Sequence, residues 1–373
     1  MKISTLALAL VAFLFLGTTI TAPTARAQYI AQSVEYGASA FIFGVPDTTA
    51  RDLGILTSSG FGWAKMMVPW RSIEYSCKGC LDWAELDRSV AAANAAGVKV
   101  LLRIDFSPPW AAEVQTDNSP PNNPADFVDF MNRLVDRYRT DSPIGRVHAV
   151  QIWNEPNLTR DWGERPIDRK TAREYAYLLK ETYKSVKQVD PNITVVTAGL
   201  SPTATNDGTA APDDVYLDWL FQSGIKGSYD VLGVHGAGYG NPPETEIMSV
   251  PGYDYPAFYF RRVEQLRAIQ ERYGDADKQV WLLEFGWTTD QVNPDYSWFA
   301  VTPAQQADYI VRAYKYAKAN WSPWMGVMFL WTLNDPRWSP ANEQYWWAVN
   351  EPDGTPRPAL TSFKEARASG VLP

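Results

Sequence analysis

Two glutamates each end an apolar, strand-like segment, and these are the residues whose chemistry stands out. Glu155 follows Val150–Trp153 in "VQIWNEPN", and Glu284 ends "VWLLE". A carboxylate is costly to bury unless hydrogen bonds or neighbouring charges compensate it, so a core alone would not select these residues. Two carboxylates about 5 to 5.5 Å apart can open a glycosidic bond in two displacements, one as nucleophile and the other as acid and base. We therefore expect Glu155 and Glu284 to converge on one site.

The alternative for either glutamate alone is a salt-bridged acid at the end of a strand. Both acids together, with Asn154 beside one of them and aromatic residues nearby, favour a shared catalytic site over two structural ion pairs. Burial and the neighbouring negative charge are expected to raise the pKa of one carboxyl group, so that it holds a proton near pH 7. That carboxyl group would act as the acid, and the other as the nucleophile.

Eight short apolar segments alternate with longer amphipathic ones, which predicts parallel strands alternating with helices. The expected strands are Ser39–Val45, Trp63–Val68, Val98–Asp105, Val147–Trp153, Ile193–Ala198, Val231–His235, Val280–Phe285 and Val327–Trp331. The expected helices include Leu81–Ala96, Pro124–Thr140, Asp168–Val189, Ala257–Tyr273 and Pro303–Ala319, with a short one within Ala210–Gly224. Eight such units indicate an α/β fold, a (β/α)8 TIM barrel that forms a single catalytic domain over residues 28–373. An open sheet that binds a nucleotide would carry a glycine-rich phosphate loop, and the sequence has none.

A TIM barrel carries its functional residues at the carboxyl ends of its strands. Polar and aromatic residues do gather at these ends, namely Asp105, Asn154, Glu155, His235, Glu284, Trp331, Asn334 and Asp335. In the fourth and seventh strands, Glu155 and Glu284 would face each other across the mouth of the barrel. This distribution supports the barrel over an open sheet.

The first 27 residues have the pattern of a secretory signal peptide. Lys2 supplies positive charge, Leu6–Leu16 is apolar, and Ala25–Ala27 is a small-x-small cleavage site. The apolar run is too short to span a membrane. We therefore expect a secreted protein, extracellular or periplasmic, that has no membrane attachment after cleavage. A monomer is expected as well.

The composition narrows the classes of partner. The 373 residues carry a net charge of −8 at pH 7, which does not suit a nucleic-acid-binding protein, and they include 16 Trp, 19 Tyr and 15 Phe. Aromatic rings in this number suit stacking on the apolar faces of sugars. Cys77 and Cys80, in "CKGC", are expected to form a small disulfide. With only His148 and His235 in the chain, a zinc site is poorly supported, and we expect no metal and no cofactor.

Several motifs resemble those of the retaining glycoside hydrolases of clan A. "WNEPN" (Trp153–Asn157) and "LEFGW" (Leu283–Trp287) are similar to the clan's signatures on strands four and seven. "SPPWA" (Ser107–Ala111), "DVLGVHGAGYG" (Asp230–Gly240) and the stretch from Trp70 to Leu102 resemble the family 39 β-xylosidase-like branch and cellulase-like relatives. The resemblance spans nearly the whole chain after the signal segment, and it implies a (β/α)8 barrel that acts on carbohydrate.

The resemblance also implies roles for individual residues. Glu155 matches the acid/base and Glu284 the nucleophile, while Asn154 matches the residue that binds the sugar 2-hydroxyl. His235 and Tyr239 fall where strand six offers a sugar contact and a tyrosine that orients the nucleophile, although "HGAGYG" is spaced differently from the clan's pattern. Trp331 matches the aromatic floor beneath the reacting sugar.

One position departs from the clan's pattern. Where relatives carry an arginine near the end of strand two, this sequence has Lys65 in "WAKMMVPW". A lysine can hold a carboxylate ionised by its charge but lacks the bidentate fork of arginine, and Arg103 on the next strand is the candidate substitute. Trp110 and Trp287 are candidates to line the substrate cleft, each with a packed structural position as the alternative. Of Trp346–Trp347, one ring is expected to pack and the other to lie near sugar.

The function that combines these expectations is a secreted retaining glycoside hydrolase that acts on plant- or microbial-type oligosaccharides or polysaccharides. A non-catalytic carbohydrate-binding barrel and a transglycosylase are the alternatives, because both would retain the same cleft. A serine hydrolase is excluded because the sequence has no G-x-S-x-G motif.

Overall fold

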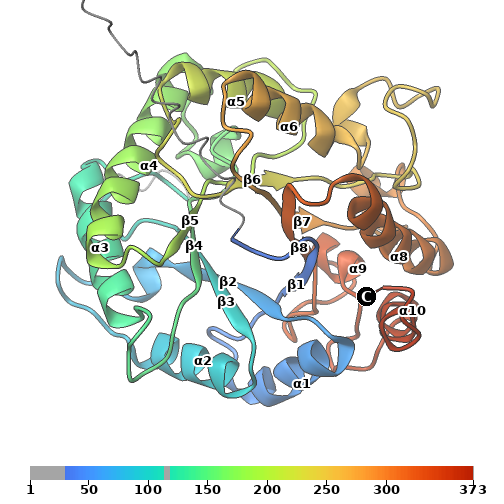
Figure 1. Ribbon diagram of the computed structural model, residues 1–373, viewed down its shortest axis with the longest axis horizontal. Helices are drawn as coiled ribbons and strands as arrows, with labels where there is room; N and C mark the ends of the chain where they lie inside the picture. The colour runs from blue at the N-terminus through green and yellow to red at the C-terminus, as the bar shows by residue number, and fades with distance from the viewer. Residues whose placement is uncertain (1–29, 113–117, 373) are drawn as a thin grey trace, which may run out of the picture.

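Eight parallel strands form a ring in the computed structural model, which describes residues 30–112 and 118–372 (Figure 1). The strands pair in the order β5-β4-β3-β2-β1-β8-β7-β6, and a parallel bridge between Val196 and Val231 joins the two ends of that order. The fold is therefore the expected (β/α)8 barrel. The signal peptide expected over residues 1–27 lies outside the described residues. The strands are β1 (Glu35–Ser39), β2 (Trp63–Pro69), β3 (Lys99–Asp105), β4 (Ala149–Ile152), β5 (Thr194–Val196), β6 (Leu232–His235), β7 (Val280–Phe285) and β8 (Met325–Leu330).

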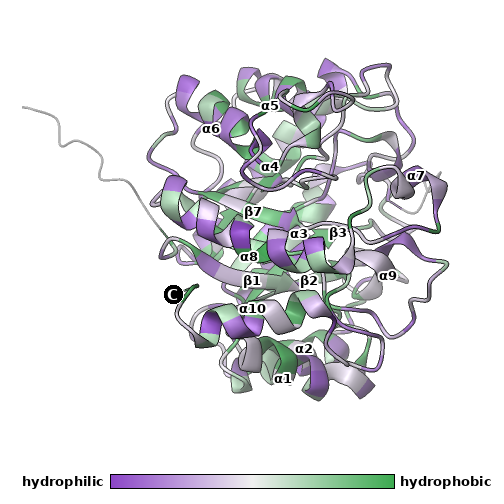
Figure 2. Ribbon diagram, turned by 90° about the vertical axis from the view of Figure 1, so that its right-hand side faces the viewer, coloured by the Kyte–Doolittle hydropathy of each residue, from purple (hydrophilic) through white to green (hydrophobic). Residues whose placement is uncertain are grey.

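Each strand is followed by a helix that packs on the outside of the ring, as Figure 1 shows. The outer helices are α1 (Thr49–Ser59), α2 (Ala84–Ala95), α3 (Pro124–Arg137), α4 (Arg169–Val189), α5 (Asp213–Gln222), α6 (Arg262–Arg272), α8 (Pro303–Asn320) and α10 (Pro358–Ala368). Two short helices, α7 (Pro294–Ser297) and α9 (Glu343–Trp347), interrupt the loops after β7 and β8. Figure 2 shows both of them on one side of the barrel. None of the helices in the described ranges is long and apolar enough to cross a membrane.

The first strand differs from the prediction. Strand β1 covers Glu35–Ser39, whereas the expected segment Ser39–Val45 is almost entirely loop. The segment "EYGAS" has a low strand propensity, because it contains the charged Glu35 and the glycine at position 37. The barrel needs that glycine, because a Cβ atom at Gly37 would lie 2.6 Å from the Phe329 ring. Packing in the barrel interior therefore overrides the local strand propensity.

Large aromatic side chains fill the interior of the barrel. Trp63 packs edge-on against Trp281 with ring centroids 5.1 Å apart, and Phe329 contacts both rings. Gly326 gives this cluster room, since a Cβ atom there would lie 2.2 Å from the Trp281 indole. The barrel is thus a packed core below the mouth, and only the carboxyl ends of the strands remain open to a ligand.

Three outer helices begin where the sequence predicts. Asn123 caps α3 by accepting a hydrogen bond from the Ala125 N–H group. Asp168 and Thr302 each form a capping box, at α4 and α8. These caps satisfy the first N–H groups of the helices and set where each loop at the mouth of the barrel ends.

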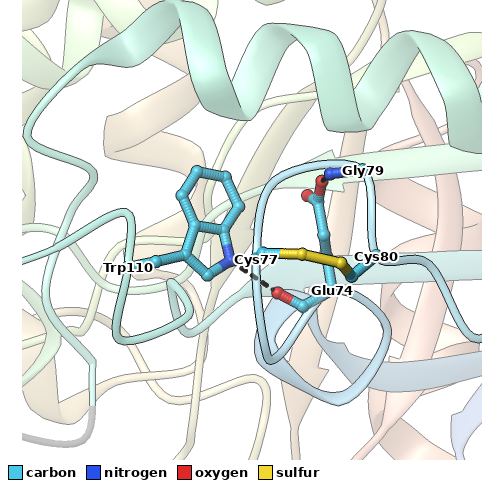
Figure 3. The surroundings of a disulfide bond; sticks show 5 residues. All are labelled: Glu74, Cys77, Gly79, Cys80 and Trp110. Carbon is cyan, nitrogen blue, oxygen red and sulfur yellow. Dashed lines mark hydrogen bonds between the residues drawn. A yellow bond between two sulfur atoms is a disulfide. The ribbon is translucent and has the colours of Figure 1, made fainter.

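The predicted disulfide joins Cys77 and Cys80 in the β2–α2 loop (Figure 3). Glu74 holds this loop, because its carboxylate accepts hydrogen bonds from the Gly79 N–H group and from Trp70 Nε1. The Trp110 indole donates to the Glu74 carbonyl oxygen at 2.8 Å and packs edge-on against Trp70. Trp110 is therefore part of the support for the disulfide loop, and the expectation that it lines the catalytic cleft is wrong.

Candidate active site

The two glutamates meet at the mouth of the barrel, with His235 between them. His235 Nδ1 lies 2.9 Å from Glu155 Oε1, and His235 Nε2 lies 3.9 Å from Glu284 Oε1. One carboxylate oxygen from each glutamate and one ring nitrogen of His235 all lie within 4.8 Å of one another. Convergence of three side chains from β6, β7 and the end of β4 is what the sequence predicts for the barrel mouth.

The backbone after β4 is bent to deliver Glu155. Trp153 and Glu155 have φ values of 68° and 41°, in the left-handed region that bulky residues avoid. Three hydrogen bonds hold the bend: Trp153 N–H to the Ile104 oxygen, the Trp153 indole to the Asp161 oxygen, and Glu155 N–H to the Gly199 oxygen. The bend aims the Glu155 carboxylate into the barrel mouth.

Gly199 also makes room for His235. A Cβ atom at position 199 would lie 2.2 Å from the imidazole ring, so only glycine allows the ring to reach its place between the two glutamates. His235 is 3% exposed, and its Nε2 has no hydrogen-bond partner among the described residues. The ring is thus fixed by packing and by its bond to Glu155.

A lysine and an arginine neutralise Glu284. Lys65 Nζ lies 2.6 Å from Glu284 Oε1 and also donates to the Leu283 carbonyl oxygen. Arg103 lies 3.8 Å from the same carboxylate oxygen, but its closer partner is the fully buried Asp105 at 2.7 Å. Lys65 is therefore the direct partner of Glu284, and Arg103 adds a second, more distant positive charge. Asp105, one of the polar residues expected at the strand ends, is paired with Arg103 and fully buried.

The charges around the two glutamates correct one expectation from the sequence. Burial raises the pKa of Glu284, but the charges of Lys65, His235 and Arg103 outweigh it and lower the pKa overall. Burial likewise raises the pKa of Glu155, yet the hydrogen bond and charge of His235, with Arg160 and Arg103, lower it to about 2. Neither carboxyl group has a raised pKa in the free protein, because each has its own cationic partner. Lys65 was considered for this role from the sequence, whereas the pairing of Glu155 with His235 and Arg160 appears only in the structure.

Lys65→Met is expected to shift the acidic limb of the pH profile of kcat/KM to higher pH. Without the lysine, burial and the charge of Glu155 still raise the pKa of Glu284, while much of the opposing charge is gone. The shift should be about 1 unit or more, the usual effect of a cation within 4–6 Å of a carboxylate. The measurement is the pH dependence of kcat/KM on a substrate for which turnover is first established, since this ratio reports the free enzyme.

Lys65→Arg is the matched control for this prediction. Arginine keeps the positive charge, so its acidic limb should stay near that of the original protein even if the rate falls. An unchanged profile in Lys65→Met would show that Lys65 does not set the ionisation of Glu284.

Asn154 and Trp331 also lie where they are expected. Asn154 is 4% exposed, and its Oδ1 accepts a hydrogen bond from Gln151 Nε2, which fixes the amide. Its Nδ2 makes no hydrogen bond to the described residues. Asn154 and Trp331 line a cavity of about 310 Å³, together with Glu155, Glu284, His235 and Arg103. These six residues form one continuous surface at the mouth.

Five polar side chains of this cavity were not predicted. They come from the loops after β4, β7 and β8, and they are Arg160, Asp161, Tyr296, Glu343 and Gln344. Trp347 also lines the cavity, and it is one of the paired tryptophans for which sugar contact was expected. Arg160 sits at the exposed rim and donates to Glu155 Oε2 at 3.2 Å. Loop residues carry no periodic pattern, which is why the sequence does not single out the others.

Two of these unexpected residues are acids with raised pKa values. Burial and the charge of Glu155 raise the pKa of Asp161 to about 6, against the opposing charges of Arg103 and Arg160. Burial raises the pKa of Glu343 to about 7, although Trp347 Nε1 donates to its carboxylate at 2.7 Å. The acids that hold a proton most readily near neutral pH are thus in the wall of the cavity rather than at its centre.

Two other candidates lie outside the cavity. Tyr239 donates from its hydroxyl to the Pro202 carbonyl oxygen at 3.3 Å and packs against Phe258 and Phe299, so it does not contact Glu284. Trp287 is fully buried, and its indole donates to the Asn241 carbonyl oxygen. Of the two roles considered for Trp287, lining the cleft or packing in the structure, it has the second.

Glu155, His235 and Glu284 could in principle ligate a metal ion, because their donor atoms lie so close together. The surrounding charges oppose it. Lys65 Nζ already occupies Glu284 at 2.6 Å, and Arg103 and Arg160 add two positive charges at the same cavity. A divalent cation would meet three positive side chains, so the donor set suits carboxylate chemistry better than metal binding.

The same fold occurs in solved glycoside hydrolases. The chain is similar to a family 39 glycoside hydrolase from the gut symbiont Bacteroides cellulosilyticus WH2, with a TM-score of 0.68, 20% identity, and coverage of 91% of this chain but 64% of that one. It is also similar to a glucosidase from Croceicoccus marinus, with a TM-score of 0.64, 15% identity, and coverage of 90% of this chain and 68% of that one. A third similar structure is Thermotoga maritima Cel5A, solved with a mannotriose substrate. Its TM-score is 0.54 at 12% identity, with coverage of 88% of this chain and 97% of that one. The expected resemblance to family 39 is confirmed at the level of the fold.

Comparisons of sequence add nothing to this assignment. No protein-family model matches the chain, and no curated protein matches it. The first of the solved structures is also longer, so that the chain spans 64% of its length. What the fold and the cavity together define is a (β/α)8 barrel of the kind found in glycoside hydrolases, with two glutamates and a histidine at its mouth.

Proposed function

We propose that this protein is a retaining glycoside hydrolase in which Glu284 is the nucleophile and Glu155 the acid/base. The observation that carries the proposal is the separation of the two carboxylates, whose nearest oxygens lie within 4.8 Å. Inverting enzymes need room for a water molecule between the sugar and the base, and their carboxyl groups lie about 6.5–9.5 Å apart, whereas retaining enzymes need about 5–5.5 Å. The short distance favours direct attack by a carboxylate.

The charges suit this division of roles. Lys65 keeps Glu284 ionised, as a nucleophile must be. Glu155 is ionised in the free protein and has to acquire a proton before it can act as an acid. A sugar ring packed against Glu155 would exclude water, and its leaving group would displace the exposed Arg160. Both changes raise the pKa of Glu155, so that it can take up a proton from solvent as the substrate enters.

The reaction then runs in two displacements. A Glu284 oxygen bonds to the anomeric carbon while the bond to the leaving oxygen breaks, and Glu155 gives that oxygen its proton. Glu155, now a carboxylate, takes a proton from water, whose oxygen bonds to the anomeric carbon as Glu284 leaves. The sugar departs with its configuration kept, Asn154 would hold the 2-hydroxyl, and Trp331 would lie beneath the ring.

A mechanism-based label tests the proposal. A panel of 2-deoxy-2-fluoro glycosides with good leaving groups should trap the covalent intermediate, and mass spectrometry of the digested protein should find one sugar on the peptide that contains Glu284. NMR of the first product formed from an aryl glycoside should show the anomer of the substrate. A different labelled residue, or the opposite anomer, would reject this mechanism.

The same panel separates the alternatives. A non-catalytic carbohydrate-binding barrel would bind sugars yet remain unlabelled by every member of the panel. A transglycosylase would be labelled at Glu284 but would pass the sugar to an added acceptor in preference to water. Because the paired glutamates and their cations are all in place, labelling and hydrolysis are the expected results.

A further inference from the structure

A second cavity, of about 690 Å³, lies beside the catalytic one on the same face of the barrel. One wall comes from the β3–α3 loop at Ser119 and from the β4–α4 loop at Trp162. The opposite wall is one face of the first turns of α4, at Lys170, Arg173 and Tyr177. Consecutive residues line the two cavities, since Asp161 contributes to the catalytic cavity and Trp162 to this one.

This cavity is positively charged in a protein that is negative overall. Arg165, Lys170 and Arg173 line it together with a single acid, Glu174, and the chain carries −8. Arg165 is paired with Glu174 at 2.5 Å. Lys170 and Arg173 are exposed and make no ion pair with any described residue. Two positive charges therefore remain to meet a negative ligand.

The rest of the wall suits a sugar ring. Tyr177 is 53% exposed, and Pro120, Pro121 and Pro124 give the wall an apolar surface beside it. An exposed tyrosine ring offers a flat apolar face with a polar edge, which is the pattern that a sugar ring complements. The cavity thus combines an aromatic face with two cations that make no ion pair to the described residues.

We propose that this cavity binds an anionic group on a saccharide, a uronate carboxylate or a sulfate ester. Lys170 and Arg173 would neutralise the anion and donate charge-assisted hydrogen bonds to it, and Tyr177 would stack on the ring. The inference rests on the proposed function in one respect: it makes acidic glycans the substrate class, with the anionic sugar held next to the catalytic cavity.

Titration with monosaccharides tests the site without catalysis. The probes are D-glucuronate and D-glucose 6-sulfate, with D-glucose as the neutral control, and binding is followed by NMR or calorimetry on the full chain. At least one anionic probe should bind about tenfold more tightly than glucose, because hydrogen bonds to ions are roughly twice as strong as neutral ones. Binding should weaken as salt is added. Preference for glucuronate would assign a uronate, and preference for the sulfate a sulfate ester.

Variants locate the binding. Lys170→Ala/Arg173→Ala should reduce the affinity for the anionic probe to that for glucose, whereas Lys184→Ala, an exposed lysine further along α4, should leave it unchanged. Equal affinity for glucose and both anions would overturn the inference, as would anion binding that survives the double substitution. Since no probe is hydrolysed, a protein that fails the fluoroglycoside test can still pass this one, and the reverse holds too.

Discussion

Glu284→Gln is expected to lower kcat on an aryl glycoside by on the order of 10⁴-fold or more, the scale of loss when a covalent nucleophile is removed. The amide cannot form the glycosyl ester, so the first displacement has no nucleophile. KM should change far less, because Glu284 is one of many groups that line the cavity. Steady-state kinetics and the fluoroglycoside label measure the two consequences, and the variant should take up no label.

This substitution also leaves a buried cation without its partner. Lys65 is 3% exposed, and its bond to Glu284 is the ion pair that balances it. Glu284→Gln should therefore lower the melting temperature, while Glu284→Gln/Lys65→Met should regain part of that loss. If the double variant recovers stability but not activity, the loss of rate belongs to the nucleophile and not to unfolding.

Glu343→Gln is the matched control in the same cavity. Its carboxyl group has a pKa of about 7. Near pH 7 much of it is therefore already neutral, and replacing it with the isosteric, neutral amide changes the charge of the cavity little. The loss of kcat should be at least a hundredfold smaller than for Glu284→Gln, given that polar contacts are worth about 1–3 kcal/mol. Comparable losses in the two variants would remove Glu284 from its proposed role.

Glu155→Ala should reduce turnover by about 10²- to 10⁴-fold, the usual contribution of a general acid and base. The size should depend on the leaving group, since a good leaving group needs no proton and leaves only the second displacement impaired. Azide should then restore part of the rate, because it attacks the glycosyl–enzyme without losing a proton. Its nitrogen bonds to the anomeric carbon as Glu284 leaves, and the product is a glycosyl azide with the configuration of the substrate.

Two outcomes would contradict this role for Glu155. An unaffected rate would show that another group supplies the proton, and Asp161, with a pKa of about 6, would be the next to replace. Rescue by azide to the opposite anomer would mean that azide replaced the nucleophile instead. His235→Ala is the useful companion variant, because it removes the 2.9 Å partner of Glu155 and leaves the carboxylate in place.

The electrostatic balance of the site links these predictions. Glu284 is held by Lys65 and Glu155 by His235 and Arg160, so both glutamates are ionised in the free protein. The proposed cycle needs one of them to gain a proton when the substrate arrives. Arg160 is the cation most easily displaced, because it alone is exposed at the rim. Substrate binding would then itself switch Glu155 from base to acid.

The barrel and the positions of its two glutamates can be predicted from patterns that span only a few neighbouring residues in the sequence. Alternating apolar and amphipathic segments predict the barrel, because each strand must be buried on both sides and each helix on one. Glu155 and Glu284 are then placed at the mouth by their positions at the ends of β4 and β7. Only β1 was misplaced, because Gly37 serves a contact with Phe329 that lies nearly 300 residues away in the chain.

The sequence alone determined that a barrel would bring two glutamates, an asparagine and a histidine to one mouth. Only the tertiary structure decided which cation serves Glu284, that both glutamates are ionised, and that Tyr239 and Trp110 lie elsewhere. It alone also revealed the basic cavity at Lys170 and Arg173. The physical reason is that burial patterns repeat along the chain, whereas charge pairing and cavity shape depend on side chains brought together from distant loops.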